Sequence, residues 1–164
     1  MLPTANRLNN VKEYYFSTKL REVRHLMDQG KPIINLGIGS TDLAPPREVI
    51  TALKSADIHG YQSYQGIPEL RKSIAEFYHK YYQVSLDFRN EILPLMGSKE
   101  GILHISMAFL NQGDQALIPD PGYPTYAAVT RLVEAEPVSY PLKEDKNWWP
   151  DLKEIEKKDL SKVR

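Results

Sequence analysis

The sequence contains no cysteine among its 164 residues. This absence excludes disulfide bonds, thiolate metal sites and a cysteine nucleophile, and it is typical of proteins from a reducing compartment. Long apolar runs are missing too, because no run approaches the roughly 18 residues of a membrane span and residues 1–7 hold no signal-peptide stretch. We therefore expect a cytoplasmic protein.

An excess of charge of one sign is equally absent, since 21 Lys and Arg residues balance 21 Asp and Glu residues. A strongly basic chain would indicate nucleic acid or an anionic membrane as partner, so neither partner is expected. The four histidines are scattered, and no His, Asp or Glu group has the spacing of metal ligands, so no metal is predicted. Hydrophobic residues make up 41% of the chain, which is ordinary for a folded domain.

Hydrophobic periodicity, with proline and glycine as punctuation, predicts the order of the elements. The expected helices cover residues 11–29, 47–56, 68–83, 98–110 and 124–134. The expected strands cover residues 92–95, 115–118 and 137–140, and residues 33–36 are expected to be extended. The second half thus alternates as βαβαβ, which is typical of a parallel sheet with right-handed crossovers. Three strands leave the edges and faces of a sheet uncovered, so we expect an incomplete domain.

The segment before residue 164 also carries two local signals. Asp151 and Glu154 form a capping-box pattern that predicts a polar helix continuing to Arg164. Trp148 and Trp149 directly precede this pattern, and we expect the pair to be a buried anchor between layers rather than a recognition motif.

The first candidate site is the turn at residues 97–101, with the sequence GSKEG, between an expected strand and an expected helix. The start of a helix offers unpaired backbone N–H groups and the positive end of the helix dipole, which suit an anion such as a phosphate. Gly97 lets the backbone approach a ligand closely, and Ser98 adds a hydroxyl donor. The turn is neither a Walker A loop nor a GxGxxG fingerprint. The alternative, which needs no ligand, is a serine N-cap after a turn glycine.

The second candidate is the turn at residues 120–126, DPGYPTY, which directly follows the next expected strand. Ligands of open parallel sheets bind beyond the carboxyl ends of the strands, so this turn and residues 97–101 are expected to face one pocket. Tyr123 is held between Gly122 and Pro124, which suits a ring that stacks on a planar ligand. Packing within the turn is the alternative role of this ring.

Two further loops complete the set. Residues 36–42, LGIGSTD, carry two glycines that allow backbone amides to approach a carboxylate, or that simply permit a tight turn. Residues 59–71, HGYQSYQGIPELR, offer two phenols and an imidazole ahead of a helix, or alternatively an aromatic packing cluster.

Together and in this order, the four segments resemble the class I/II aminotransferases, a family of fold-type-I pyridoxal-phosphate enzymes. Residues 35–39 and 97–101 look most like the branch with LL-diaminopimelate and alanine-type aminotransferases. The resemblance covers nearly the whole chain and implies an α/β fold, the N-terminal part of the family's architecture. It implies that residues 1–45 form the N-terminal helix and substrate loop of the small domain. Residues 46–164 would form an incomplete large domain that binds the cofactor.

The resemblance implies a role for the residues of the two sheet-edge turns. The backbone N–H groups of Ser98 and Lys99, beside Gly97, would hold the phosphate of pyridoxal 5'-phosphate, and the Ser98 hydroxyl would assist them. Tyr123 would stack on the pyridine ring of the cofactor. Cofactor binding is thus expected at the place that the helix-start argument also selects.

The two other loops receive roles by the same resemblance. Ile38 and Gly39 would border the substrate, with the amide near Gly39 meeting its α-carboxylate. Tyr61 would reach across a subunit interface to the cofactor phosphate of the neighbouring subunit. A homodimer with shared active sites is therefore expected.

The resemblance also implies residues that are not found here. The family needs a Schiff-base lysine, an aspartate at the pyridine nitrogen and an arginine for the substrate carboxylate, and these lie later in the family than Arg164. The expected reaction of the parent enzyme is amino-group transfer between an amino acid and a 2-oxo acid, with the 164-residue stretch inactive alone. The alternative is a non-catalytic truncated fragment, or a dimerisation or binding module, of the same fold.

Overall fold

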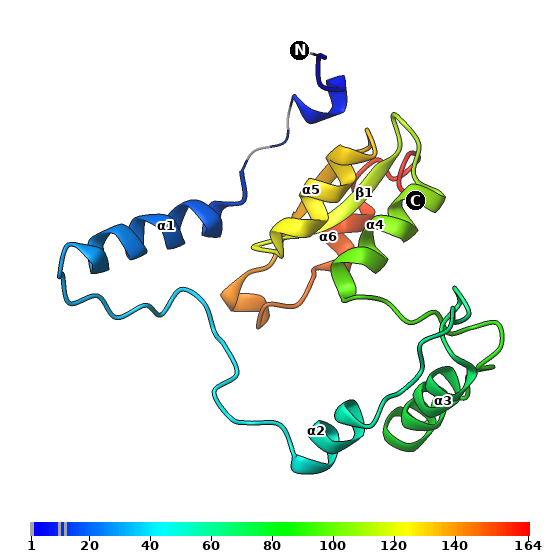
Figure 1. The fold of residues 1–164 in the computed structure, drawn as a ribbon. Helices are drawn as coiled ribbons and strands as arrows, with labels where there is room; N and C mark the ends of the chain where they lie inside the picture. Colours follow the sequence, from blue (N-terminus) through cyan, green and yellow to red (C-terminus); the bar gives the residue numbers. More distant parts are fainter. Residues whose placement is uncertain (1, 10, 12) are drawn as a thin grey trace. The chain divides into compact units, whose positions relative to one another are not determined.

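The computed structural model describes residues 2–9, 11 and 13–164, and Figure 1 shows the elements along the chain. The chain divides into two compact units. We call Met1–Lys12 with Leu95–Arg164 the sheet unit, and Glu13–Pro94 the helical unit. The domain boundary expected between residues 45 and 46 concerns the complete enzyme and stays a prediction.

The sheet unit is built on one βαβ motif. Strands β1 (Gln115–Asp120) and β2 (Glu136–Pro141) pair in parallel, in a register that runs from Gln115 opposite Glu136 to Asp120 opposite Pro141. Helix α5 (Pro124–Leu132) connects the strands and contacts both of them, and α4 (Ser98–Phe109) packs against α5. A short 3-10 helix, η1 (Asn6–Leu8), contacts α5. The predicted α/β class with a parallel sheet is therefore confirmed (Figure 1).

The strand predicted over residues 92–95 is wrong. In the described part of the chain these residues pair with no strand, and the sheet contains β1 and β2 alone. A strand exists only where a neighbour completes its ladder of hydrogen bonds, and Pro94 has no N–H to contribute to one. The observed order is thus βαβ rather than βαβαβ.

The end of the sheet unit confirms a cap but not a long helix. Asp151 is the N-cap of α6 (Leu152–Glu156), and its carboxylate accepts a hydrogen bond from the Glu154 N–H at 3.3 Å. The helix ends at Glu156, so the predicted continuation to Arg164 is wrong. The chain instead turns back to β1, where the Gln115 N–H donates to the Lys162 carbonyl at 2.7 Å in an isolated parallel bridge. This pairing with β1 takes the place of the last helical turns.

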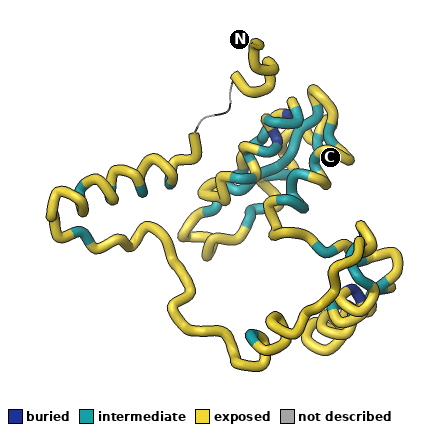
Figure 2. Tube along the Cα trace, viewed as in Figure 1, coloured by how far each residue is buried: buried dark blue, intermediate teal, exposed yellow. Residues whose placement is uncertain are grey.

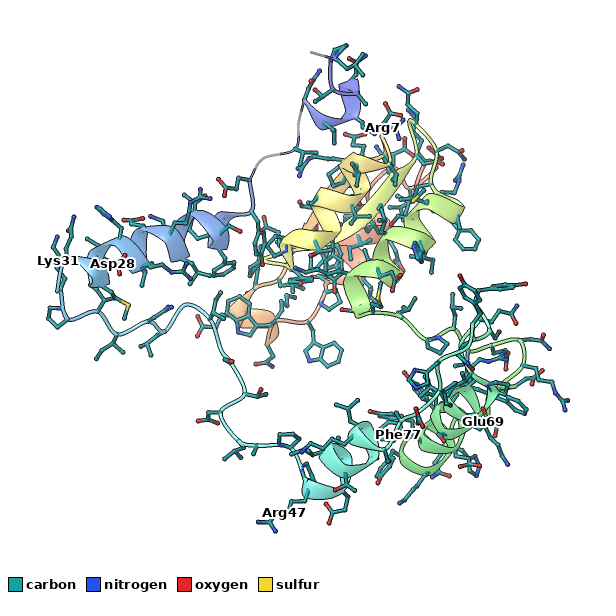
Figure 3. All side chains as sticks on the ribbon, viewed as in Figure 1. Arg7, Asp28, Lys31, Arg47, Glu69 and Phe77 are labelled. Atoms are coloured by element: carbon teal, nitrogen blue, oxygen red, sulfur yellow. The ribbon has the colours of Figure 1, made fainter. Side chains whose placement is uncertain are left out.

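The helical unit contains three helices with bounds close to the expected ones: α1 (Tyr15–Asp28), α2 (Arg47–Lys54) and α3 (Pro68–Tyr82). Helix α3 has proline at its first position, where the missing N–H costs nothing, and it ends at Gln83 in the left-handed conformation. Phe77, labelled in Figure 3, lies 4.7 Å from Tyr81 between ring centroids. Buried Arg71 donates from Nη1 to the Arg89 carbonyl at 3.1 Å, which ties α3 to the loop after it.

Burial is slight in both units, as Figure 2 shows. Among the described residues Ala135 is the one buried hydrophobic side chain, and Arg71 and Thr130 are buried polar ones. Trp148 and Trp149 are 56% and 73% exposed, so the expectation of a buried anchor is wrong. The described part of the chain provides no layer to cover these rings, and the 3-10 helix η2 (Glu144–Lys146) directly before them is exposed as well.

Candidate functional site

The sheet unit brings the turns at residues 97–101 and 120–126 together. Lys99 lies in the first turn of α4, and its Nζ is 5.5 Å from the ring centroid of Tyr123, which lies just after β1. Lys99 and Tyr123 lie close together because of the fold: a turn after a parallel strand and the start of a packed helix both lie at the carboxyl edge of the sheet. The structure thus places Lys99 and Tyr123 close together, whereas the expectation that the two turns face one pocket stays a prediction.

The first turn of α4 is shaped by Gly97. This residue is the helix N-cap with φ 103° and ψ 161°, a conformation that L side chains rarely adopt. A Cβ built on Gly97 would meet no atom within 4 Å, so open space borders the helix start. Ser98 is the first helical residue rather than the N-cap, and no side chain of the N-cap residue covers the first-turn N–H groups. The alternative interpretation of Ser98 as a capping serine is therefore wrong.

Glu100 is a residue of this turn that the sequence analysis gave no role. Its Oε2 accepts a hydrogen bond of 2.6 Å from the backbone N–H of Met96, one residue before Gly97. The contact is not a capping box, because the N-cap is glycine and the N–H that Glu100 accepts from belongs to the residue before it, so the sequence held no complete motif for this role. This hydrogen bond holds the backbone in place just before the turn. It also occupies the carboxylate of Glu100, the one acidic side chain of residues 97–101.

Tyr123 occupies the N-cap position of α5 without a side-chain capping hydrogen bond, and its ring lies near Lys99. Its ring lies 5.8 Å from that of Tyr126 in a T-shaped arrangement, and Tyr123 is 40% exposed. Before it, a Cβ on Gly122 would lie 2.2 Å from the Pro119 carbonyl oxygen, so only glycine fits there. A hydrogen bond with Thr125, followed by one with Lys99, lowers the pKa of Tyr123 below its ordinary value.

Ile38, Gly39 and Tyr61 lie in the helical unit. Ile38 lines a cleft of about 370 Å³ between α1 and residues 34–38, to which α1 contributes Phe16 among other side chains. A Cβ on Gly39 would meet nothing within 4 Å, and Tyr61 is fully exposed. The roles expected for these three residues stay predictions. The contribution of α1 to the cleft was not anticipated, because its stripe indicates only a packing face.

Metal-ligand clusters and membrane-spanning helices are both absent from the described part of the chain. It holds no group of three or more His, Asp or Glu side chains placed as metal ligands would be. None of its helices combines the length and the apolar character needed to cross a bilayer.

The features of the sheet unit fit a planar cofactor with a phosphate group. The uncapped start of α4 and the open space at Gly97 suit the phosphate, because backbone N–H groups and the helix dipole both favour an anion there. The exposed ring of Tyr123, adjacent to this turn, suits the planar part. The residues present are therefore compatible with pyridoxal 5'-phosphate.

Comparison with known proteins identifies the family of the chain. The sequence profile of the family described as aminotransferase class I and II matches residues 31–162, and the chain belongs to that family. The LL-diaminopimelate aminotransferase of Natranaerobius thermophilus is 42% identical over 98% of this chain and 43% of its own length.

Solved structures are similar to this chain as well. BacF of Bacillus subtilis, determined with bound substrate, is 34% identical with a TM-score of 0.86, covering 100% of this chain and 43% of that one. The aspartate aminotransferase of Rhizobium meliloti is 24% identical with a TM-score of 0.93, covering 100% of this chain and 42% of that one, which shows a shared fold. The chain thus spans about two fifths of the length of these relatives.

Proposed function

We propose that this chain supplies the phosphate cradle and the stacking ring of a pyridoxal-phosphate-dependent aminotransferase. The observation that carries the proposal is the start of α4, where an uncapped helix end borders open space at Gly97 and Lys99 links it to Tyr123. Membership of the aminotransferase family supports the proposal. The complete enzyme would transfer an amino group between an amino acid and a 2-oxo acid.

Each residue of the cradle has a defined task in this proposal. The N–H groups of Ser98 and Lys99 and the hydroxyl of Ser98 donate hydrogen bonds to the phosphate. A charge-assisted bond of this kind contributes about 1.5–3 kcal/mol. Tyr123 lies against the face of the ring and keeps water from it. When bound, the cofactor supplies an electron sink on which an amino acid loses its α-proton.

The helical unit would provide the substrate side of the site. Ile38 and Gly39 would border the substrate, and Tyr61 would reach the cofactor phosphate in a second subunit of a homodimer. The names of the relatives make LL-diaminopimelate the first amino donor to test. A cytoplasmic location remains part of the proposal.

The lysine that holds the cofactor covalently is proposed to lie outside the 164 residues. This can be tested by the intact mass of the protein from its native source, before and after borohydride reduction with added pyridoxal 5'-phosphate. A mass well above 18.8 kDa, with one cofactor adduct on one lysine beyond residue 164, supports the proposal. A mass of 18.8 kDa without a stoichiometric adduct supports the non-catalytic alternative instead.

The reaction itself is tested by incubating the complete protein with LL-diaminopimelate and a panel of 2-oxo acids. Formation of the amino acid that corresponds to one of these acids is the expected result. A matched incubation with the 164-residue chain is the control, and it should show no transfer.

A further inference from the structure

The side chain of Lys99 contacts the ring of Tyr123, in addition to the task proposed for its backbone N–H. We propose that the Lys99 side chain is a positioning residue, which holds the Tyr123 ring in place for stacking and is not a ligand of the cofactor phosphate. The inference rests on the proposed function, because it assigns the stacking role to Tyr123.

The geometry joins two separate elements of the sheet unit. Lys99 is the second residue of α4, whereas Tyr123 is the N-cap of α5. The Nζ to ring-centroid distance of 5.5 Å lies within the roughly 6 Å over which an ammonium is attracted to an aromatic ring. The lowered pKa of Tyr123 agrees with the contact, since Lys99 contributes to it through a hydrogen bond and through its charge, after Thr125.

The other neighbours of the ring leave room for a ligand. Tyr126 lies perpendicular to Tyr123, with 5.8 Å between centroids and an interplanar angle of 81°, so it contacts the ring by an edge and not by parallel stacking. Tyr123 is still 40% exposed. A ring that is held by Lys99 and Tyr126 and remains open to the solvent is ordered before the cofactor arrives, which reduces the entropy lost on binding.

The test compares variants of the complete enzyme in its cofactor-free form. Lys99→Met removes the charge and keeps the length, Lys99→Arg keeps the charge, and the probes are pyridoxal 5'-phosphate and pyridoxal, which lacks the phosphate. We expect Lys99→Met to lower the affinity for both probes by about threefold, which corresponds to the free energy of an exposed cation–ring contact. Lys99→Arg should bind both probes as the wild type does.

Two controls separate positioning from other effects. In a Tyr123→Leu background, Lys99→Met should cause no further loss, because the ring that it positions is gone. Lys80→Met is the matched control, because Lys80 Nζ lies 5.0 Å from the Tyr81 ring centroid on α3 of the helical unit. This variant should leave the affinity for both probes unchanged.

Three results would overturn the inference. They are a loss confined to the phosphate-bearing probe, an equal loss in the Tyr123→Leu background, and unchanged affinity for both probes. If the wild type binds neither probe, the proposed function fails. The contact between Lys99 and Tyr123 can then be tested alone by titrating the phenol of Tyr123. Its signal is the change in absorbance that is missing in Tyr123→Phe. Lys99→Met should raise the pKa of this phenol, and an unchanged titration contradicts the contact.

Discussion

Replacement of Gly97 by alanine is expected to release the cofactor while leaving the fold intact. Gly97 has φ 103° and ψ 161°, and holding a residue with a side chain in such a conformation costs about 1–3 kcal/mol. The added Cβ meets no protein atom within 4 Å, so the strain comes from the backbone and not from a clash. The chain relieves this strain by moving the start of α4. The loss of one charge-assisted hydrogen bond to the phosphate corresponds to about a ten- to hundredfold loss in cofactor affinity.

A matched variant separates backbone strain from damage to the cradle. Gly113 has φ 89° and equally open surroundings, but it lies beyond the other end of α4, a helix about 18 Å long. Gly113→Ala should therefore lower the free energy of unfolding by a similar amount without loss of cofactor. The assay is pyridoxal-phosphate retention after dialysis of the complete enzyme, with urea unfolding alongside. Equal cofactor retention in both variants would refute the assignment of the cradle.

Gly122→Ala is expected to lower the free energy of unfolding by about 1–3 kcal/mol in urea titrations, because its Cβ would lie 2.2 Å from the Pro119 carbonyl oxygen; wild-type stability would contradict that packing. The pKa of Asp151 is lowered mainly by the Glu154 N–H, so its stabilisation is present above the unfolded-state pKa and is lost as the pH falls through the folded-state pKa. Asp151→Asn keeps the cap, and unfolding curves should show a smaller loss of stability below about pH 4 than the wild type; an identical pH profile would refute this. The 164-residue chain expressed alone should self-associate on size-exclusion chromatography through exposed apolar residues such as Phe109, and a sharp monomer peak with a cooperative melt would count against it.

Local signals predicted most helix bounds closely. The proline at the start of α3 is a signal of one residue, and the apolar periodicity of α3 depends on residues three or four positions apart, so the sequence alone predicts this helix. Helix α1 begins four residues later than expected, at Tyr15. The cap at Asp151 is equally local, and it was predicted together with its partner Glu154.

Features that depend on distant partners were not predictable. Residues 92–95 have an apolar pattern suited to a strand, but no neighbour pairs with them in the described part of the chain. The pairing of Val163 with Gln115 replaces an expected helix by a bridge across 48 positions of sequence, since 163 − 115 = 48. The turn motifs predicted that residues 97–101 and 120–126 would lie at the same edge of the sheet, whereas the contact of Lys99 with Tyr123 depends on side-chain reach, which only the folded arrangement shows.

The central claim is that the start of α4 holds the phosphate of pyridoxal 5'-phosphate. The most direct test is a crystal structure of the complete enzyme with the cofactor bound. We predict phosphate oxygens within hydrogen-bond distance of the Ser98 and Lys99 N–H groups, with the pyridine ring stacked on Tyr123. A phosphate bound elsewhere, with the first turn of α4 open to water, would contradict it.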